Sequence, residues 1–256
     1  VIAEVNPKAV ETRYSQGWVD EVISDQGSLA AKILEARRQN KPRSFAFRGN
    51  IVDLWEYLAT NDIRVDIGSD QTSLHNPWAG GYYPAGVSFE ESGRLISSDP
   101  EKFRELVRES LRRQVRAINY HCERGTYFFD YGNAFLLEAS RAGADILDPT
   151  GEFRYPSYVQ DIMGPMCFDY GFGPFRWVCC SNSLADLEMT DSIAIEVLER
   201  LLLTSPPEIS LQMSDNIRWI REAGRNKLVV GSQARILYAD AEGRAEIAWA
   251  FNNAIR

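Results

Sequence analysis

The pattern of hydrophobic and polar residues in the first 70 positions alternates between short apolar runs and longer stretches with helical spacing. Short runs of this kind are typical of strands, and apolar residues three or four positions apart are typical of helices with one buried face. The predicted strands are Val1–Val5, Ser44–Phe47 and Arg64–Ile67. The predicted helices are Pro7–Tyr14, one capped by Ser28 that carries Leu29, Ile33 and Leu34, and one after Gly49-Asn50 that carries Ile51, Leu54, Trp55 and Leu58.

Strands that alternate with helices in this way predict a parallel sheet with right-handed crossovers. Parallel sheets bind their ligands beyond the carboxyl ends of the strands. Glu4, Asn50 and the loop from Asp70 to His75 all follow the ends of predicted strands. The sequence therefore predicts a ligand site at this edge of the sheet.

Residues 99–143 predict a long helix, a strand and a shorter helix. Asp99-Pro100 suits the start of a helix that runs to about His121, and the strand Thr126–Phe129 precedes a helix that ends near Gly143. The exposed side of the long helix is basic, which favours a solvated face over a phosphate-binding one. Its basic residues are Lys102, Arg104, Arg108, Arg112, Arg113 and Arg116.

After Asp148-Pro149 the sequence becomes rich in aromatic residues, glycine and proline, and we expect a domain boundary near residue 147. Thr190-Asp191 is predicted to start an apolar helix that ends before Pro206-Pro207. The remaining residues predict further helices, which carry Trp219, Ile236 and Trp249. The chain is thus predicted to be α/β over residues 1–147 and mixed, mainly helical, over residues 148–256.

Composition restricts the kind of protein. With 256 residues, 45% of them hydrophobic and 25% charged, the chain resembles globular proteins that bury a sizeable core. A net charge of −8 argues against nucleic-acid binding through bulk charge. No apolar run reaches the ~20 residues that span a membrane, and no signal sequence is visible. The four cysteines lack a zinc-ligand spacing, so we expect reduced thiols, no metal and a cytoplasmic protein.

The stretch SDQTSLHNPWAGGYYPAG, residues 69–86, holds the densest group of polar side chains. The amide and hydroxyl groups of Gln71, Thr72 and Ser73 suit phosphate or amide groups of a ligand, and Gly80-Gly81 permits a close backbone approach. His75 suits an acid, a base or a group that orients a ligand. A hydrogen-bonded turn without a ligand is an equally good interpretation of the local pattern.

Four further residues are candidates, each with a structural alternative. Glu4 suits ribose hydroxyls, although an exposed acid at a strand end is the commoner case. Tyr131 suits a planar ring, or packing at the sheet edge. Arg176, in GFGPFRW, suits a carboxylate, or stacking between Phe175 and Trp177. Cys167 suits a nucleophile, although a buried thiol is the usual role. His121, late in the long helix, favours a structural role.

Several long motifs together resemble the urocanase (urocanate hydratase) family. They are DQTSLHNPWAGGYYPAG, TYFFDYGNAFLLEASRAGAD, RYPSYVQDIMG and GFGPFRWVC, in that order, with VIAEVNPKAVETRYSQGWVDEV and RGNIVDLWEYL before them. The resemblance covers essentially the whole chain and is closer to the eukaryote-like branch. It implies the later part of a Rossmann-like NAD-binding domain, followed by part of the urocanase core domain.

The resemblance also implies a cofactor and its site. Members of the family hold NAD⁺ tightly, use it as an electrophile and add water to urocanate, giving 4-imidazolone-5-propanoate in histidine degradation. The full-length enzyme is expected to be a homodimer. Catalytic roles fall to Arg176, which we expect to bind the substrate carboxylate, and to His75. The implied cofactor contacts are Glu4, Asn50, Ile51, Gln71, Thr72, Ser73, Leu74, His75, Tyr82, Tyr83 and Tyr131.

Three departures from the family pattern leave alternatives open. The glycine-rich turn that receives the pyrophosphate is expected to precede the first residue, and family segments from both ends of the polypeptide, which complete the active site, are expected to be missing too. The chain is therefore expected to be an internal fragment that is inactive alone. Asp169 stands where the bacterial family has its active-site cysteine, and Cys167 lies two residues earlier. The alternative functions are a non-catalytic fragment of this enzyme and a conventional NAD(P)-dependent dehydrogenase domain.

Overall fold

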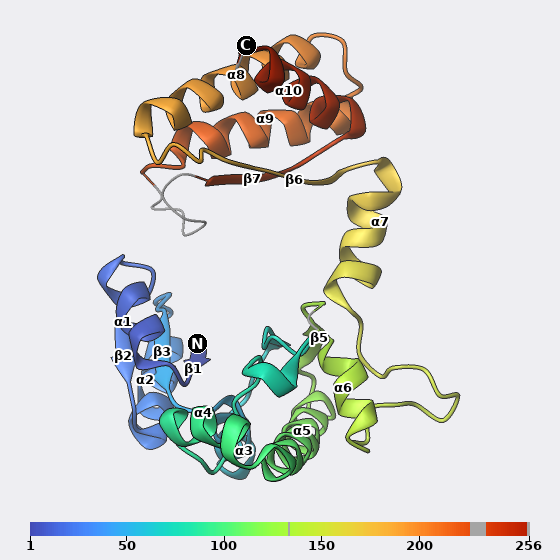
Figure 1. Ribbon diagram of the computed structural model, residues 1–256. Coiled ribbons are helices and arrows are strands. Elements are labelled where there is room, and N and C mark those ends of the chain that lie inside the picture. The colour runs from blue at the N-terminus through green and yellow to red at the C-terminus, as the bar shows by residue number, and fades with distance from the viewer. Residues whose placement is uncertain (133, 226–233, 255–256) are drawn as a thin grey trace. The chain divides into compact units, whose positions relative to one another are not determined.

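The computed structural model describes residues 1–132, 134–225 and 234–254 (Figure 1). Asn133, part of the polar run that starts at Asp130, lies outside the described residues. The chain divides into two compact units, Val1–Ile162 and Met163–Arg256. Each unit has its own hydrophobic core, and the two are described separately.

The first sheet of the first unit is parallel, with strand order β1-β3-β2. Its strands are β1 (Ile2–Glu4), β2 (Glu21–Ile23) and β3 (Phe45–Arg48), and its helices are α1 (Pro7–Ser15), α2 (Gln26–Arg38) and α3 (Ile51–Thr60). Phe45 and Phe47 of the central strand are buried with Leu29, Leu54 and Leu58 from the helices. The predicted alternation of strands and helices is confirmed here.

The second sheet pairs β4 (Ile67–Asp70) with β5 (Tyr127–Asp130), again in parallel. The helices around it are α4 (Phe89–Ser98), α5 (Pro100–Cys122) and α6 (Phe135–Arg141), with a short 3₁₀ turn η1 (Pro77–Ala79). Its core contains Phe103, Leu111 and Ile118 of α5 together with Phe128 and Phe135. The long helix therefore buries the face that its sequence spacing predicted.

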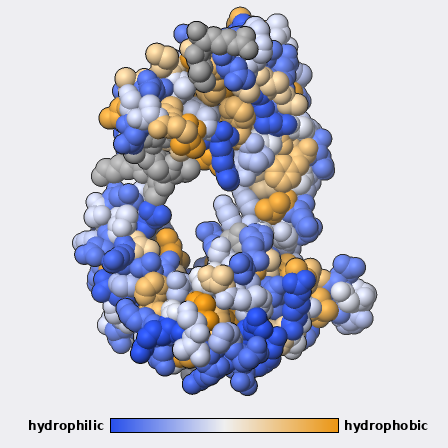
Figure 2. Space-filling model, viewed as in Figure 1, coloured by the Kyte–Doolittle hydropathy of each residue, from blue (hydrophilic) through white to orange (hydrophobic). Residues whose placement is uncertain are grey.

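Several charged residues on the outward face of α5 are paired with one another or with α3. Arg112 and Arg116 contact Glu109, and Arg104 contacts Glu101. The part of the surface over α3, α4 and α5 is correspondingly hydrophilic in Figure 2. These contacts agree with a solvated helix face, the interpretation that the sequence favoured.

Residues 145–157 belong to the first unit, so the predicted boundary near residue 147 falls inside it. Tyr155 donates a hydrogen bond to Asn119 Oδ1 at 2.6 Å, and Arg154 pairs with Asp145 at 2.8 Å. The Asp130 N–H donates to Pro156 O at 3.0 Å. These contacts attach an irregular, proline-containing segment to α5 and β5, and composition alone did not reveal them.

The second unit packs helices on an antiparallel pair of strands, β6 (Gly173–Val178) and β7 (Ala234–Ala239). The helices are α8 (Leu184–Leu202), α9 (Pro207–Glu222) and α10 (Ala241–Ala254), and the short segments α7 (Gly164–Met166) and η3 (Phe168–Tyr170) precede β6. The segment η2 (Tyr158–Met163) lies at the end of the first unit and only its last residue belongs to the second. Trp177, Leu198, Met213 and Ile247 form the centre of its core.

Several predicted boundaries in the first unit are wrong. The strand predicted at Arg64–Ile67 begins only at Ile67 and runs to Asp70, although the carbonyl oxygen of Asp66 already accepts the N–H of Tyr127 at 3.0 Å. Asp25, not Ser28, caps α2, since its carboxylate accepts the Ser28 N–H at 2.7 Å. The strand β2 was not predicted.

Two predictions in the second unit are also wrong. The apolar helix begins at Leu184 rather than at Thr190, whose hydroxyl bonds to carbonyl oxygens within the helix and so does not interrupt it. Ile236 lies in β7, opposite Arg176, rather than in a helix. Trp219 and Trp249 do lie in helices, α9 and α10.

Candidate functional site

A groove of about 480 Å³ lies at the carboxyl ends of β1, β3 and β4. This volume falls in the range of roughly 300–1,000 Å³ that is common for small-molecule sites. The groove is lined by residues 1–5, 49–51, 69–73 and 81–83. Both sheets of the first unit therefore contribute to one site, at the edge where parallel sheets bind ligands.

Glu4 ends β1 and is half-buried at this groove. Its Oε1 atom accepts the N–H of Asn6 at 2.8 Å, which holds the side chain near the strand end. Asn6 in turn caps α1 by accepting the N–H of Lys8 at 3.0 Å. The sharp turn from strand to helix thus keeps a carboxylate at the groove.

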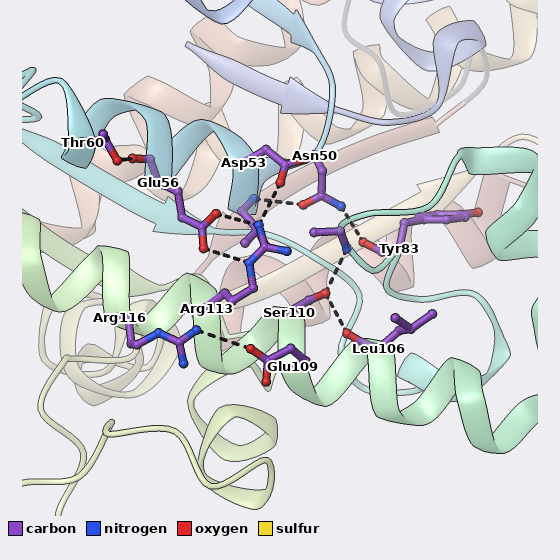
Figure 3. Close-up of polar contacts among 12 residues, drawn as sticks. Asn50, Asp53, Glu56, Thr60, Tyr83, Leu106, Glu109, Ser110, Arg113 and Arg116 are labelled. Carbon is purple, nitrogen blue, oxygen red and sulfur yellow. Dashed lines mark hydrogen bonds and ion pairs between the residues drawn. The ribbon is translucent and has the colours of Figure 1, made fainter.

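Asn50 connects the start of α3 to the loop on the other side of the groove (Figure 3). Its Oδ1 atom accepts the N–H of Val52 at 2.9 Å and caps the helix. Its Nδ2 atom donates to the carbonyl oxygen of Tyr83 at 2.8 Å. One side chain therefore fixes both a helix N-terminus, which favours anions, and the opposite wall.

The loop after β4 is closed by a backbone hydrogen bond from Ser73 N–H to Gly81 O, at 3.1 Å. Gly81 lies so close to the opposite strand of the loop that a Cβ atom would be 2.1 Å from Ser73 O and 2.7 Å from Asn76 O. Only glycine fits this contact without a shift of the backbone. The predicted need for a close backbone approach is real, but here the partner is the loop itself.

Asp70, at the end of β4, is buried and accepts hydrogen bonds from two directions. Oδ1 accepts the N–H of Thr72 at 2.9 Å and also its hydroxyl, and Oδ2 accepts Nε2 of Gln114 at 2.8 Å. Gln114 Oε1 accepts the hydroxyl of Tyr82 at 3.1 Å. Burial raises the pKa of Asp70, and the hydrogen bonds from Thr72 and Gln114 oppose this shift.

Three of the predicted cofactor residues do not line the groove. Leu74 is only 1% exposed, and its side chain belongs to the core around α5. His75 is exposed and lines a neighbouring cavity. Tyr131 stacks on Tyr158, with ring centroids 4.9 Å apart and planes inclined by 4°. The other predicted residues, Glu4, Asn50, Ile51, Gln71, Thr72, Ser73, Tyr82 and Tyr83, all line it.

The neighbouring cavity has a volume of about 710 Å³ and is lined by His75, Asp130 and residues from 132 to 161. Asp130 is opposite Asp70 in the register of the two strands and is also buried. Its Oδ1 atom accepts the N–H of Gly132 at 2.9 Å. The carboxylates at the ends of β4 and β5 thus each organise the loop that follows them.

Arg176 and Cys167 belong to the second unit. Arg176 lies in the middle of β6, where residues alternate between two faces, so Phe175 and Trp177 point to the opposite face and belong to the core. The alternative role of Arg176, stacking between these two rings, is therefore excluded. Its exposed guanidinium shares a face with Pro174 and Val178. Cys167 is partly buried in the turn before β6, and Asp169 is exposed.

Sequence reasoning missed Gln114, which has no exposed surface and takes part in the hydrogen bonds of the loop. A signal was available, because Gln114 stands at helical spacing between the apolar residues Leu111 and Ile118. A polar residue on the buried face of a helix requires a partner. Across the described residues, no cluster of three His, Cys, Asp or Glu suits a metal, and no helix is long and apolar enough to cross a membrane.

The parallel strands, with a groove at their carboxyl ends, place the first unit among α/β folds of the Rossmann-like kind, which is consistent with a nucleotide-binding fold. Residues 1–162 match the family model of the Urocanase Rossmann-like domain, and residues 165–256 match that of the Urocanase C-terminal domain. The chain belongs to the urocanase family. This confirms the resemblance carried by its motifs.

Relatives with curated names agree with this assignment. The chain is 56% identical to "Probable urocanate hydratase" of Dictyostelium discoideum and 53% identical to "Urocanate hydratase" of Mus musculus. It is 50% identical to "Probable urocanate hydratase" of Caenorhabditis elegans. Each match covers 100% of the chain but only 38% or 39% of the relative, so the chain spans about two fifths of the length of these proteins.

Proposed function

We propose that this chain is part of a urocanate hydratase, which adds water to urocanate to give 4-imidazolone-5-propanoate in histidine degradation. The observation that carries the proposal is the groove at the carboxyl ends of β1, β3 and β4, since most of the predicted cofactor contacts line it. The family membership of the chain supports the same activity. We also propose that the full-length enzyme is a homodimer.

The groove fits the chemistry of NAD⁺ in three respects. Glu4 offers a carboxylate for ribose hydroxyls, and Asn50 places the N-terminus of α3 at the groove, where it favours phosphate. The backbone and side chains of Thr72 and Ser73 offer uncharged hydrogen-bonding groups. When bound, NAD⁺ supplies an electron-poor ring that activates the substrate imidazole toward water, and it is not consumed.

The residues of the chain are then assigned to binding and orientation. Asn50, through Tyr83, keeps the two walls of the groove at a fixed separation. Arg176 binds the propenoate carboxylate of urocanate, a role that suits its exposed, two-pronged guanidinium. His75 orients the ligand or transfers a proton from its place on the neighbouring cavity. Cys167 is not assigned a step.

The experiment follows the ultraviolet absorbance of urocanate with this chain and with a polypeptide of the full length of its relatives. We expect loss of absorbance with the longer polypeptide alone, because the chain covers only 38–39% of the relatives. Urocanate turnover by the 256-residue chain alone would refute the expectation that this chain is inactive by itself. Turnover by neither polypeptide would refute the proposed urocanate hydratase activity. Net formation of reduced nicotinamide would instead support a dehydrogenase.

Arginine 176 provides a second test in the longer polypeptide. Replacing Arg176 with Ala is expected to raise the KM for urocanate by about tenfold to a hundredfold, since a charge-assisted pair contributes roughly 1.5–3 kcal/mol, while bound NAD⁺ is retained. Arg218→Ala is the matched control, because Arg218 lies on α9 and pairs with Asp215 on the surface. An unchanged KM in the Arg176 variant would remove this role.

A further inference from the structure

Gln114 links the two ends of the loop that forms one wall of the groove. This loop runs from Asp70, at the end of β4, to Tyr82. Gln114 reaches both ends from α5, because its Nε2 atom donates to Asp70 and its Oε1 atom accepts the hydroxyl of Tyr82. Its side chain is fully buried and does not itself line the groove.

All three members of this chain of hydrogen bonds are removed from water. Asp70 is 2% exposed, Tyr82 is 1% exposed and Gln114 is 0% exposed. Buried polar groups of this kind lose much more when a partner is removed than an exposed pair does, because water cannot replace the lost bond. The orientation of the Gln114 amide is also defined, since only a donor can face the Asp70 carboxylate.

The hydrogen bonds continue from Asp70 into the groove. Asp70 holds the N–H and the hydroxyl of Thr72, and the next residue, Ser73, closes the loop through Gly81. Thr72 and Ser73 both line the groove. A change at Gln114 should therefore reach residues that face the ligand. It would do so through Asp70 and Thr72, because Gln114 itself does not line the groove.

We propose that Gln114 is a positioning residue for the cofactor site, which sets the geometry of residues 71–83 for NAD⁺. The inference rests on the proposed function for the identity of the ligand. It extends that function, because Gln114 lies outside the groove and acts through Asp70 and Tyr82. Removal of the side-chain amide should loosen the loop and weaken NAD⁺ binding, while the rest of α5 stays intact.

The first variant is Gln114→Met, which keeps the length of the side chain and removes both hydrogen bonds. The second is the double variant Asp70→Asn with Gln114→Glu. In it, the side-chain amide at position 70 donates to the carboxylate at position 114, which still accepts the hydroxyl of Tyr82. Thr72 keeps its acceptor on the side-chain oxygen at position 70. The net charge and the number of hydrogen bonds are thus preserved.

Ser110→Ala is the matched control. Ser110 lies one helical turn before Gln114, is 2% exposed, and accepts the N–H of Ala85 at 2.9 Å. Its hydroxyl donates to the carbonyl oxygen of Leu106 at 2.7 Å (Figure 3). Its replacement also removes a buried hydrogen bond between α5 and the chain beyond the loop. A merely structural role for Gln114 predicts that the Met variant and the Ser110 variant behave alike.

Two measurements are made on a polypeptide of the full length of the relatives: the Kd for NAD⁺ by calorimetry, and the amide hydrogen exchange of residues 71–83 without ligand. We expect Gln114→Met to raise the Kd about tenfold or more and to speed exchange in the loop by a similar factor. The double variant should return both values to within about threefold of wild type, and Ser110→Ala should leave the Kd within that range.

Several results would overturn the inference. These are an unchanged Kd and loop exchange in the Met variant, a folded double variant as impaired as the Met variant, or an equal loss of affinity in Ser110→Ala. If the Met variant does not fold, Tyr82→Phe replaces it, because this change removes only the hydrogen bond to Gln114. Amide exchange near residue 82 should then become faster, and unchanged exchange would overturn the inference. If the wild-type polypeptide binds no NAD⁺, the proposed function fails, whereas the hydrogen exchange of the loop still tests whether Gln114 holds residues 71–83 in place.

Discussion

Replacing Gly81 with Ala is a stringent test of the loop at the groove. The added Cβ atom would lie 2.1 Å from Ser73 O, whereas Cβ atoms do not approach other heavy atoms within 3.0 Å, so the two segments must separate by about 0.9 Å. The shift breaks the hydrogen bond from Ser73 N–H to Gly81 O. That loss costs about 0.5–1.5 kcal/mol, and overpacking adds roughly 1–3 kcal/mol.

We therefore expect the Gly81 variant to open the loop more easily by about 1.5–4.5 kcal/mol, which corresponds to roughly a tenfold to two-thousandfold increase in the open population. Amide hydrogen exchange of residues 71–83 measures this, and calorimetry with NAD⁺ measures its effect on binding. Gly93→Ala is the control, because an added Cβ in α4 meets nothing within 4 Å and should stabilise the helix by about 0.5–1 kcal/mol. Wild-type exchange in the Gly81 variant would refute the reasoning.

Three further predictions concern stability, measured as the free energy of unfolding in denaturant. Burial lowers the pKa of His121 below its value of 6.5 in the unfolded chain, so stability should fall as the pH drops below about 6.5; His121→Gln should flatten this dependence, and an unchanged slope would contradict it. Asn40 has φ of 51° just after α2, so Asn40→Gly should gain about 0.5 kcal/mol and Asn40→Val should lose about 1 kcal/mol, and equal stabilities would contradict this. Arg113 bonds to Asp53 and Glu56, and its hydrogen bond to Glu56 lowers the pKa of that carboxyl below 4.5. Arg113→Met should cost about 1–2 kcal/mol at pH 7 and less as the pH falls through the lowered pKa, and a loss that is constant with pH would exclude this linkage.

The α/β class of the first unit and most of its strands and helices could be predicted, because their periodicity and capping residues are local. Asn50 and Asp99 cap the helices that follow them, as the sequence suggested. The strand β2 was missed because it has only three residues and is fixed by pairing with β3, a tertiary contact. Ile236 was misplaced for a similar reason, since only its pairing with β6 makes that segment a strand.

The groove could be predicted from residues that follow the ends of the strands, and the motifs supplied its particular contacts. Sequence position could not separate residues that face the groove from neighbours that face the core. Leu74 and Ser73 are adjacent, yet Leu74 is buried and Ser73 lines the groove. Gln114 is distant in sequence from Asp70, so their contact depends on how α5 packs on the second sheet.

The packing of α3 has a consequence for the cooperativity of unfolding. Leu54 and Leu58 of this helix are buried with the three-stranded sheet, whereas Trp55 is buried with the core of the other sheet. Ile51 packs against both cores. Because one helix supplies side chains to both cores, α3 cannot unfold together with one sheet without exposing apolar surface in the core of the other. The two sheets should therefore unfold together in a single transition. Their described strands share no hydrogen bonds, so this cooperativity would come from the packing of α3.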